Sequence, residues 1–239
     1  MRIVTDMPVQ TVEKIGAENP SPLRLPTPEA IASICYTSGT TGMPKGAILT
    51  HHLLASGSLS NLHGNLFESR DHGVLLSFLP LSHIYERFVE DVCFASGHAI
   101  GFSCGDNLRI LEDIQVLKPD VLVLVPRVLN RFYQAIKAAT IDLPGLKGAL
   151  IRKAYNAKLY NLRNNNTFHH GVYDKLLFKK VRALLGGNVV AIGSGSAPIA
   201  PEVLEFLKIM FSCEVTEGAS RSFSSLSAVT DVIDRIRPD

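Results

Sequence analysis

Short apolar segments that alternate with longer amphipathic segments are the feature that most restricts how this chain folds. The apolar segments have the length and the Val, Ile and Leu content of buried strands. The expected strands are Ile31–Tyr36, Gly46–Leu49, Val74–Leu79, Ala99–Phe102, Val121–Val125, Val189–Ile192 and Cys213–Thr216. The expected helices are Thr50–Leu66 (with Thr50 as the cap), Ile84–Ala95, Leu108–Leu117, Val128–Ala139, Lys147–Arg163, Val172–Leu185 and Pro201–Phe211. Apolar strands separated by helices predict an α/β fold, a mostly parallel sheet flanked by helices on both faces.

Charge and cysteine content restrict the function classes. Lys and Arg together number 24 and Asp and Glu 22, so the net charge of +2 gives no reason to expect a nucleic-acid partner. The four cysteines form no CxxC or Cys/His pattern, which predicts buried thiols in a reducing compartment rather than disulfides or a metal site. No apolar run reaches the roughly 18 residues that a membrane-spanning helix needs, and the first residues lack the pattern of a signal peptide.

Two stretches outside the strand pattern allow only coarse expectations. Residues 1–27 are rich in proline and lack periodicity, so we expect an extended lead-in. The segment Lys147–Leu185 is rich in Lys and Arg and carries His169 and His170. We interpret it as a solvated helical hairpin, and a helix pair on a membrane surface stays as the alternative.

A glycine-rich loop between two expected strands carries the strongest functional signal. In YTSGTTGMPKG, from Tyr36 to Gly46, glycines let the backbone turn and approach a ligand closely, and hydroxyls and one lysine surround them. Converging backbone N–H groups form an anion-binding concavity, so a phosphate is the expected ligand. The pattern differs from a Walker A loop, because Lys45 lies between Pro44 and Gly46 and no Ser or Thr follows it.

The longer string YTSGTTGMPKGAILTH resembles the phosphate-binding signature of the AMP-forming adenylating enzymes, the superfamily of acyl-CoA synthetases, luciferases and peptide-synthetase adenylation domains. Three further stretches resemble the long-chain fatty acid–CoA ligases among them. They are LPLSHIYERFVE (Leu79–Glu90), KPDVLVLVPRVLNRFYQAI (Lys118–Ile136) and GSGSAPIAPEVLEFL (Gly193–Leu207). The resemblance implies part of the large N-terminal domain of the acyl-CoA synthetase fold, occupying residues 28–218.

The resemblance also implies substrates and site residues. In the family, ATP and a carboxylate form an acyl-adenylate, and coenzyme A then takes the acyl group; Mg²⁺ accompanies the ATP. The implied ligands of the ATP phosphates are Thr37, Ser38, Gly39, Thr40, Thr41, Gly42 and Lys45. The implied nucleotide and acyl pocket contains Gly195, Ser196, Ala197, Pro198, Glu217 and Gly218, and no metal ligand is assigned.

His83 stands where the family has a histidine or aromatic residue near the α-phosphate and the substrate carboxylate. The alternative is a structural histidine that caps the helix after it. Arg87, Glu86 and Glu90 lie one helical turn apart, so we expect ion pairs along that helix to explain them.

The resemblance stops abruptly after Gly218. Ala219 stands where the family has a tyrosine, no Thr-Glu pair follows in register, and the Ser-rich residues 219–239 form an expected tail unlike the family. We interpret this break as a gene-model, splice or frameshift boundary and expect an incomplete domain that is inactive alone. The open alternatives are another acyl- or aryl-CoA synthetase of the superfamily and a non-catalytic interaction protein. The family also implies an intracellular, cytosol-facing location, with peripheral association with the endoplasmic reticulum or another organelle membrane left open and no oligomeric state assigned.

Overall fold

The computed structural model describes residues 7–37, 45–62, 72–195 and 198–217. Its strands are β1 (Ile31–Thr37), β2 (Lys45–Thr50), β3 (Val74–Ser77), β4 (Ala99–Phe102), β5 (Val121–Leu124), β6 (Ala191–Ser194) and β7 (Glu214–Glu217). Its helices are α1 (Val9–Glu18), α2 (His51–Leu62), α3 (Ile84–Ser96), α4 (Ile110–Leu117), α5 (Pro126–Ala139), α6 (Gly145–Asn165), the π-helix η1 (Asp174–Phe178), α7 (Lys179–Ala183) and α8 (Pro201–Phe211). Each expected strand is therefore present, with ends that differ by at most two residues from the expected ones.

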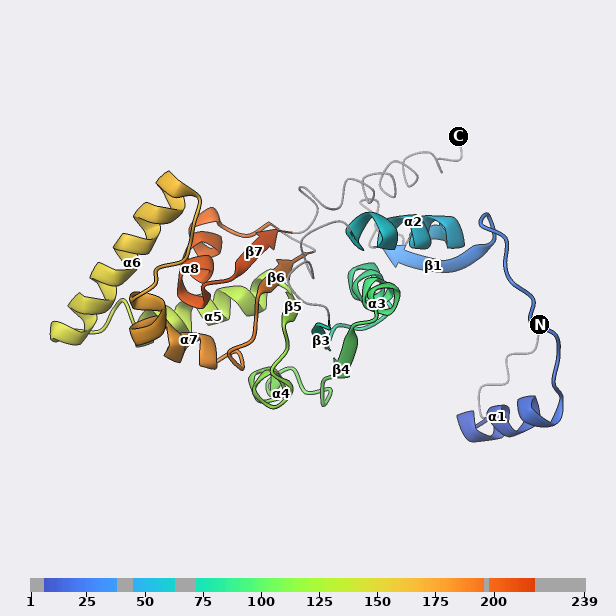
Figure 1. Cartoon of the computed structure of the whole chain (residues 1–239). Coiled ribbons are helices and arrows are strands. Elements are labelled where there is room, and N and C mark those ends of the chain that lie inside the picture. Colours follow the sequence, from blue (N-terminus) through green and yellow to red (C-terminus); the bar gives the residue numbers. More distant parts are fainter. Residues whose placement is uncertain (1–6, 38–44, 63–71, 196–197, 218–239) are drawn as a thin grey trace.

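The main sheet has five parallel strands in the order β4-β3-β5-β6-β7 (Figure 1). All four residues of β5 are fully buried, which is why its apolar run is continuous rather than alternating. Successive side chains of these strands still point to opposite faces and enter two separate cores. Leu122 packs into one core, whereas Val121 and Val123 pack into the other.

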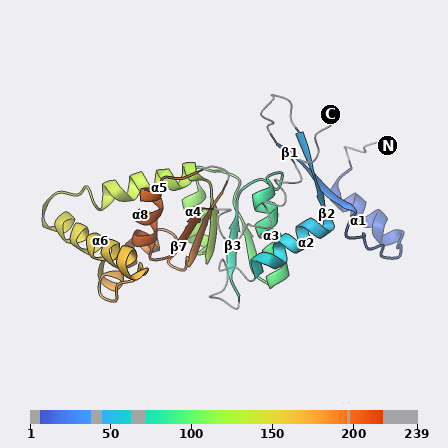
Figure 2. The same ribbon diagram turned by 90° about the horizontal axis from the view of Figure 1, so that it is seen from above.

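The two faces of the sheet carry different helices (Figure 2). Helix α3 covers one face, where Phe88 and Val92 pack beside Val121 and Val123. Helices α4, α5 and α8 cover the other face around Leu122 and share the larger core. The predicted α/β fold with helices on both sides of a parallel sheet is confirmed.

The chain changes direction between β3 and β5. From β3 the chain passes through α3 to β4, which lies on one side of β3. From β5 it passes through α5, α6, η1 and α7 to β6 and then through α8 to β7, and both strands lie on the other side. In open parallel sheets, ligands bind outside the carboxyl ends of the strands at such a switch point. The loop from β3 to α3, Phe78–His83, leaves the sheet at this point.

Strands β1 and β2 form a separate antiparallel hairpin, and α2 follows it and packs against α3. The predicted cap at Thr50 is confirmed, because its hydroxyl accepts a hydrogen bond from the backbone N–H of Leu53 at 3.3 Å. In Figure 1 the hairpin and α2 lie on the α3 side of the sheet. The hairpin therefore approaches the same helix that begins at the switch point.

The expected extended lead-in is wrong over Val9–Glu18, which forms helix α1. The helix itself contains no proline. Pro8 occupies the position before its first residue, where the fixed φ of proline is compatible with the start of a helix. None of the α1 residues is buried. The helix therefore stands apart from the cores of the described structure (Figure 1).

The expectation of a solvated helical hairpin at Lys147–Leu185 is also wrong. Helix α6 buries Ala154 and Lys158, and η1 buries Phe178, so this pair of elements completes the larger core. The expected helix Val172–Leu185 is instead a π-helical turn followed by the short helix α7. Contacts to α8 that are distant in sequence bury Lys158, whereas the other lysines of this segment stay exposed.

Candidate functional site

The glycine-rich loop connects the two strands of the hairpin. Residues 38–44, with five of the seven implied phosphate ligands (Ser38, Gly39, Thr40, Thr41 and Gly42), lie outside the described residues. The other two, Thr37 and Lys45, are paired in register at the end of the β1–β2 ladder that adjoins the loop. The expectation that this loop joins two strands, rather than a strand and a helix as in a P-loop, is confirmed.

A cavity of about 530 Å³ lies beside this hairpin, at the switch point of the main sheet. One wall is β1, and the other is the loop from β3 with the first turn of α3. The lining residues are Ser33, Ile34, Cys35, Tyr36, Pro80, Leu81, Ser82, His83 and Arg87. The strand that leads into the glycine-rich loop and the segment with His83 thus share one cavity.

His83 is both a helix cap and part of this cavity. Its Nδ1 accepts a hydrogen bond from the backbone N–H of Tyr85 at 3.3 Å, which satisfies one of the open donors of α3. Since Nδ1 is an acceptor, the neutral ring carries its proton on Nε2 and presents a donor there. The positive end of the α3 dipole lies at the same place and favours an anion. The two alternatives for His83 are therefore compatible.

Arg87 is the site residue that sequence reasoning missed. We expected it to form ion pairs with Glu86 or Glu90, yet no such pair occurs in the described structure, and its Nε donates to the Leu81 carbonyl at 3.3 Å. That hydrogen bond holds its guanidinium in the wall of the cavity that His83 lines. The spacing of four residues from His83 was the available signal, because it places both side chains on one face of a helix.

Glu86 and Glu90 on α3 are buried, and each is at most 5% exposed. Burial is the main cause that raises the pKa of Glu86 from 4.5 to about 7, and the Glu90 carboxylate raises it further. The Ser77 hydroxyl and two backbone N–H groups oppose the rise, but neither Glu86 oxygen has a partner at normal hydrogen-bond geometry among the described residues. The carboxylates of Glu86 and Glu90 thus form a buried acidic pair beneath the site, with no counter-ion among the described residues.

The end of β6 lies against Tyr85. A Cβ atom on Gly195 would come within 2.9 Å of the Tyr85 ring, and one on Gly193 within 2.6 Å of its hydroxyl oxygen. Both glycines are thus required by the packing of Tyr85, a structural reason that the sequence did not reveal. Burial, and secondarily the Glu86 carboxylate, raises the pKa of the Tyr85 phenol well above its usual range.

The remaining implied pocket residues are only partly described. Ser196, Ala197 and Gly218 lie outside the described residues. Pro198 is exposed, and Glu217 is half-buried at the carboxyl end of β7, in register with Ser194. The Ser194 hydroxyl is buried and has no hydrogen-bond partner in the described part of the chain. Strand register therefore brings Ser194 and Glu217 to the sheet edge where Tyr85 and His83 begin α3.

The described residues contain neither a group of metal-binding side chains nor a membrane-spanning helix. Within residues 7–37, 45–62, 72–195 and 198–217, no three His, Cys, Asp or Glu side chains are grouped as a metal ion would need. The donor set for Mg²⁺ that the resemblance implies is thus not provided by these residues. No helix among the described residues has the length and apolar character to cross a bilayer.

The fold is an α/β domain of the doubly wound kind with a cavity at its switch point, and comparison with known proteins specifies the family. The family model described as AMP-binding enzyme matches residues 3–219, so the chain belongs to the AMP-binding enzyme family. The match includes most of residues 1–27, which we interpreted as a lead-in.

Among curated proteins, the chain is 44% identical over 204 residues to "Long chain acyl-CoA synthetase 6, peroxisomal" of Arabidopsis thaliana, an alignment that covers 85% of the chain and 28% of the relative. It is 39% identical over 215 residues to "Long-chain-fatty-acid--CoA ligase 6" of Mus musculus, covering 88% of the chain and 30% of the relative. The chain thus spans less than a third of the length of these relatives.

Solved structures agree on the fold. The adenylation domain of a carboxylate reductase from Mycobacterium chelonae is similar with a TM-score of 0.60 and 28% identity, over 84% of this chain and 28% of that one. ATP-bound MatB from Rhodopseudomonas palustris is similar with a TM-score of 0.51 and 26% identity, over 80% of this chain and 29% of that one. The predicted membership in the adenylating enzymes and the predicted fold are confirmed.

Proposed function

We propose that this chain forms the phosphate-binding part of the adenylation domain of a long-chain fatty acid–CoA ligase. The observation that carries the proposal is the cavity shared by β1 and the loop with His83, beside the hairpin that bears the glycine-rich loop. The names of the relatives supply the substrate class, since they are long-chain acyl-CoA synthetases and long-chain fatty acid–CoA ligases.

The reaction has two balanced steps. An oxygen of the fatty acid carboxylate attacks the α-phosphorus of ATP, and pyrophosphate leaves with the electron pair of the broken P–O bond. The sulfur of coenzyme A then attacks the acyl carbon of the adenylate and gives its proton to water. AMP leaves with the electron pair of the broken C–O bond. Charge accumulates on the departing pyrophosphate, so catalysis depends on groups that hold and neutralise it.

Each residue has a proposed role in the first step. The β- and γ-phosphates contact the glycine-rich loop, and Lys45 adds positive charge. His83, with its proton on Nε2, donates to the α-phosphate or the carboxylate, and Arg87 supplies a second positive charge in the same cavity. The loop contacts come from Thr37, Ser38, Gly39, Thr40, Thr41 and Gly42; the base and the acyl chain lie near Gly195, Ser196, Ala197, Pro198, Glu217 and Gly218. No step is assigned to Mg²⁺, because the described residues do not provide its ligands.

The proposal extends to partners and location. The substrates are a long-chain fatty acid, ATP and coenzyme A. We place the whole protein inside the cell on the surface of an organelle, facing the cytosol, because the first of these relatives is peroxisomal by name. Peripheral association with that membrane agrees with the finding that the described helices do not span one.

A chimera tests the proposal. Residues 28–217 replace the matching segment of the Arabidopsis thaliana relative named long chain acyl-CoA synthetase 6, and palmitoyl-CoA formation is measured. We expect activity, a loss of about a hundredfold with Lys45→Ala, and an unchanged rate with the control Lys153→Ala on the exposed face of α6. A folded chimera that activates benzoate but not palmitate would instead favour an aryl-CoA synthetase.

His83 needs a matched pair of variants in the same chimera. Asparagine is a good helix cap and alanine is a poor one, so His83→Asn preserves the capping role while both variants remove the imidazole. We expect both to lose activity to a similar extent if Nε2 contacts the substrates. Full activity in His83→Asn would show that His83 only caps α3.

The 239 residues by themselves are expected to bind ATP weakly and to form no acyl-CoA, because they span less than a third of the relatives. Calorimetric titration with ATP and a thioester assay measure the two quantities. Acyl-CoA formation by this chain alone would refute the expectation. An inactive chimera together with specific capture of a full-length relative would support the interaction-protein hypothesis.

A further inference from the structure

A second cavity, of about 220 Å³, lies in the helical layer and shares no lining residue with the His83 cavity. It is bounded by the end of α5, the first half of α6, η1 with α7, and α8. Its apolar lining consists of Ala139, Leu150, Ile151, Leu176, Leu177, Phe178, Val181 and Met210. The Thr140 hydroxyl also lines it but already donates to the Ile136 carbonyl, so it leaves no unpaired donor facing the cavity.

Two lysines stand at this apolar cavity. Lys147 comes from α6 and Lys180 from α7, and both are exposed. Neither forms an ion pair with any carboxylate of the described residues, in contrast to Lys137, which pairs with Asp142. Two unpaired ammonium groups beside an apolar hollow complement a ligand with an anionic head and an apolar tail.

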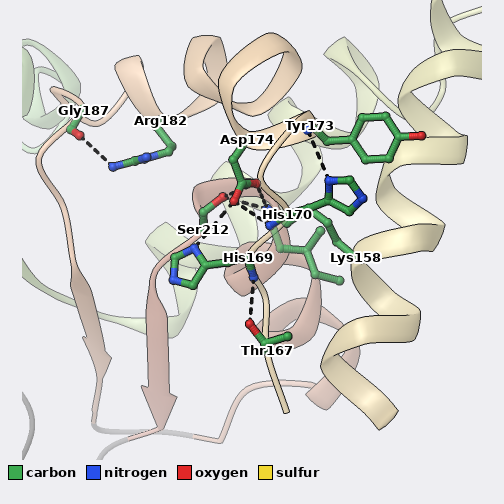
Figure 3. A network of polar contacts seen from close by, with 10 residues as sticks. Lys158, Thr167, His169, His170, Tyr173, Asp174, Arg182, Gly187 and Ser212 are labelled. Carbon is green, nitrogen blue, oxygen red and sulfur yellow. Dashed lines mark hydrogen bonds and ion pairs between the residues drawn. The ribbon is translucent and has the colours of Figure 1, made fainter. Parts of the chain in front are cut away.

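A buried polar network holds η1, which forms one wall of the cavity, in place (Figure 3). Lys158 on α6 donates to Asp174 Oδ1 at 2.6 Å, to the Ile209 carbonyl at 2.6 Å and to the Ser212 hydroxyl at 2.7 Å. Asp174 begins η1, and its Oδ2 also accepts the backbone N–H of His170 at 2.8 Å. The Lys158 ammonium lies 4.2 Å from the centroid of the Phe178 ring. The network therefore fixes both ends of η1 and keeps the cavity wall preformed.

We propose that this cavity binds a single-chain amphiphile with an acidic head group, its alkyl chain inside and its head between Lys147 and Lys180. The volume of about 220 Å³ accommodates a short stretch of alkyl chain. The exposed side chains of Leu150 and Leu176 line the opening and continue the apolar surface outward. A π-helix forms one wall, and such turns are frequent at functional sites. The inference does not depend on the proposed ligase activity.

Methionine methyl NMR on the 239-residue chain tests the proposal. The chain has four methionines, and among the described residues Met210 alone of them lines the cavity, where it is fully buried. Octanoate is the probe, since it stays monomeric at high concentration. We expect octanoate to shift the Met210 signal, assigned through Met210→Leu, and the octyltrimethylammonium ion to shift it with at least tenfold weaker affinity. No Met210 shift with octanoate, or equal affinities for the two ions, would overturn the proposal.

Charge reversal supplies matched controls. Lys147→Glu with Lys180→Glu is expected to weaken octanoate binding at least tenfold. Lys153→Glu with Lys179→Glu makes the same change of charge on neighbouring exposed lysines that do not line the cavity, and we expect it to weaken binding less than threefold. Equal weakening in the two double variants would contradict a defined site. These surface variants preserve the core, so they test the site even if cavity-filling variants fail to fold.

A vesicle experiment distinguishes the sources of the amphiphile. One result would be that the chain sediments with phosphatidylserine vesicles and that the vesicles shift the Met210 NMR signal. If both effects are lost in the variant Lys147→Glu with Lys180→Glu, the ligand is a lipid acyl chain. A Met210 shift with octanoate alone would identify a free carboxylate, and both results support the proposal. Vesicle binding without a Met210 shift would overturn it in favour of a surface contact. Titration with ATP is a separate readout, so failure of the proposed function leaves this result interpretable.

Discussion

Two groups of buried charges in this molecule differ in how they are satisfied. In α3, Glu86 and Glu90 are buried without a counter-ion among the described residues, and three of their four carboxylate oxygens have no hydrogen-bond partner there. In the helical layer, the buried ammonium of Lys158 makes three short hydrogen bonds, one of them to a carboxylate. The first group lies beneath the candidate site, whereas the second fixes the wall of a distant cavity.

The two groups of buried charges are expected to affect the stability of the fold in opposite ways. A buried charge that is fully paired fixes the elements that carry its partners, and removing one partner leaves the other uncompensated. A buried pair of like charges destabilises the fold unless at least one carboxylate takes up a proton. We therefore infer that the Lys158 network organises the helical layer, and that the α3 carboxylates are kept for a reason other than stability.

Loss of the Lys158 ammonium is expected to have the largest effect. Lys158→Met leaves the Asp174 carboxylate, which is 14% exposed, without its counter-ion, and we expect a loss of about 3–5 kcal/mol in the free energy of unfolding. Lys158→Met with Asp174→Asn removes both charges and should recover part of that loss. Urea unfolding at pH 7 measures both. Equal losses in the single and double variants would show that the charge pairing itself contributes little.

The next largest expected effect is the change in the free energy of unfolding with pH that Glu86 causes. Its pKa rises from 4.5 to about 7 on folding, so its contribution to stability is fully present below pH 4.5 and is lost as the pH rises to about 7. We expect Glu86→Gln to flatten this part of the stability profile, by about 2 kcal/mol between pH 4.5 and pH 8.

Asp174 should change the free energy of unfolding with pH in the opposite sense. Burial alone would raise its pKa, but hydrogen bonds from Lys158, His170 and Ser212 lower it, so its contribution is lost as the pH falls.

The control for this profile is Glu13→Gln on the exposed helix α1, which should leave the slope between pH 4.5 and pH 8 unchanged. Thermal unfolding at several pH values provides the measurement. An identical slope in wild type and Glu86→Gln would mean that Glu86 is ionised at little cost, and the contrast between the two groups would disappear.

What the sequence could predict depends on how far apart the interacting residues lie. The strand at Val121–Leu124 and the helix Pro201–Phe211 were predictable because apolar runs, periodicity and an N-terminal proline are local signals. The flanks of the glycine-rich loop were predictable for the same reason. Lys158 was not, since Asp174, Ile209 and Ser212 lie 16, 51 and 54 residues away, and a lysine in a basic segment normally indicates a solvated face.

The candidate site shows the same limit. His83 was predictable from a resemblance confined to one short segment. The role of Gly195 in accommodating the Tyr85 ring was not, because the two residues are 110 positions apart in the chain. Arg87 was assigned to ion pairs within its own helix, and only the fold shows that it faces β1 across a cavity.

An exposed ion pair gives the smallest expected effect and completes the comparison. Arg163 on α6 donates to both carboxylate oxygens of Glu205 on α8, at 2.8 and 3.3 Å, so this pair is bidentate and well aligned. It joins α6 to α8, which Lys158 also links through the Ile209 carbonyl. The side chain of Arg163 is 60% exposed, however, and water and salt screen the attraction. We expect the coupling in a double-mutant cycle of Arg163→Ala and Glu205→Ala to be the weakest of the three effects and to vanish in 0.5 M NaCl. The coupling between Lys158 and Asp174 should persist in that salt. A coupling for Arg163 and Glu205 that equals the buried one would show that geometry, rather than burial, decides how much these charges stabilise the helical layer.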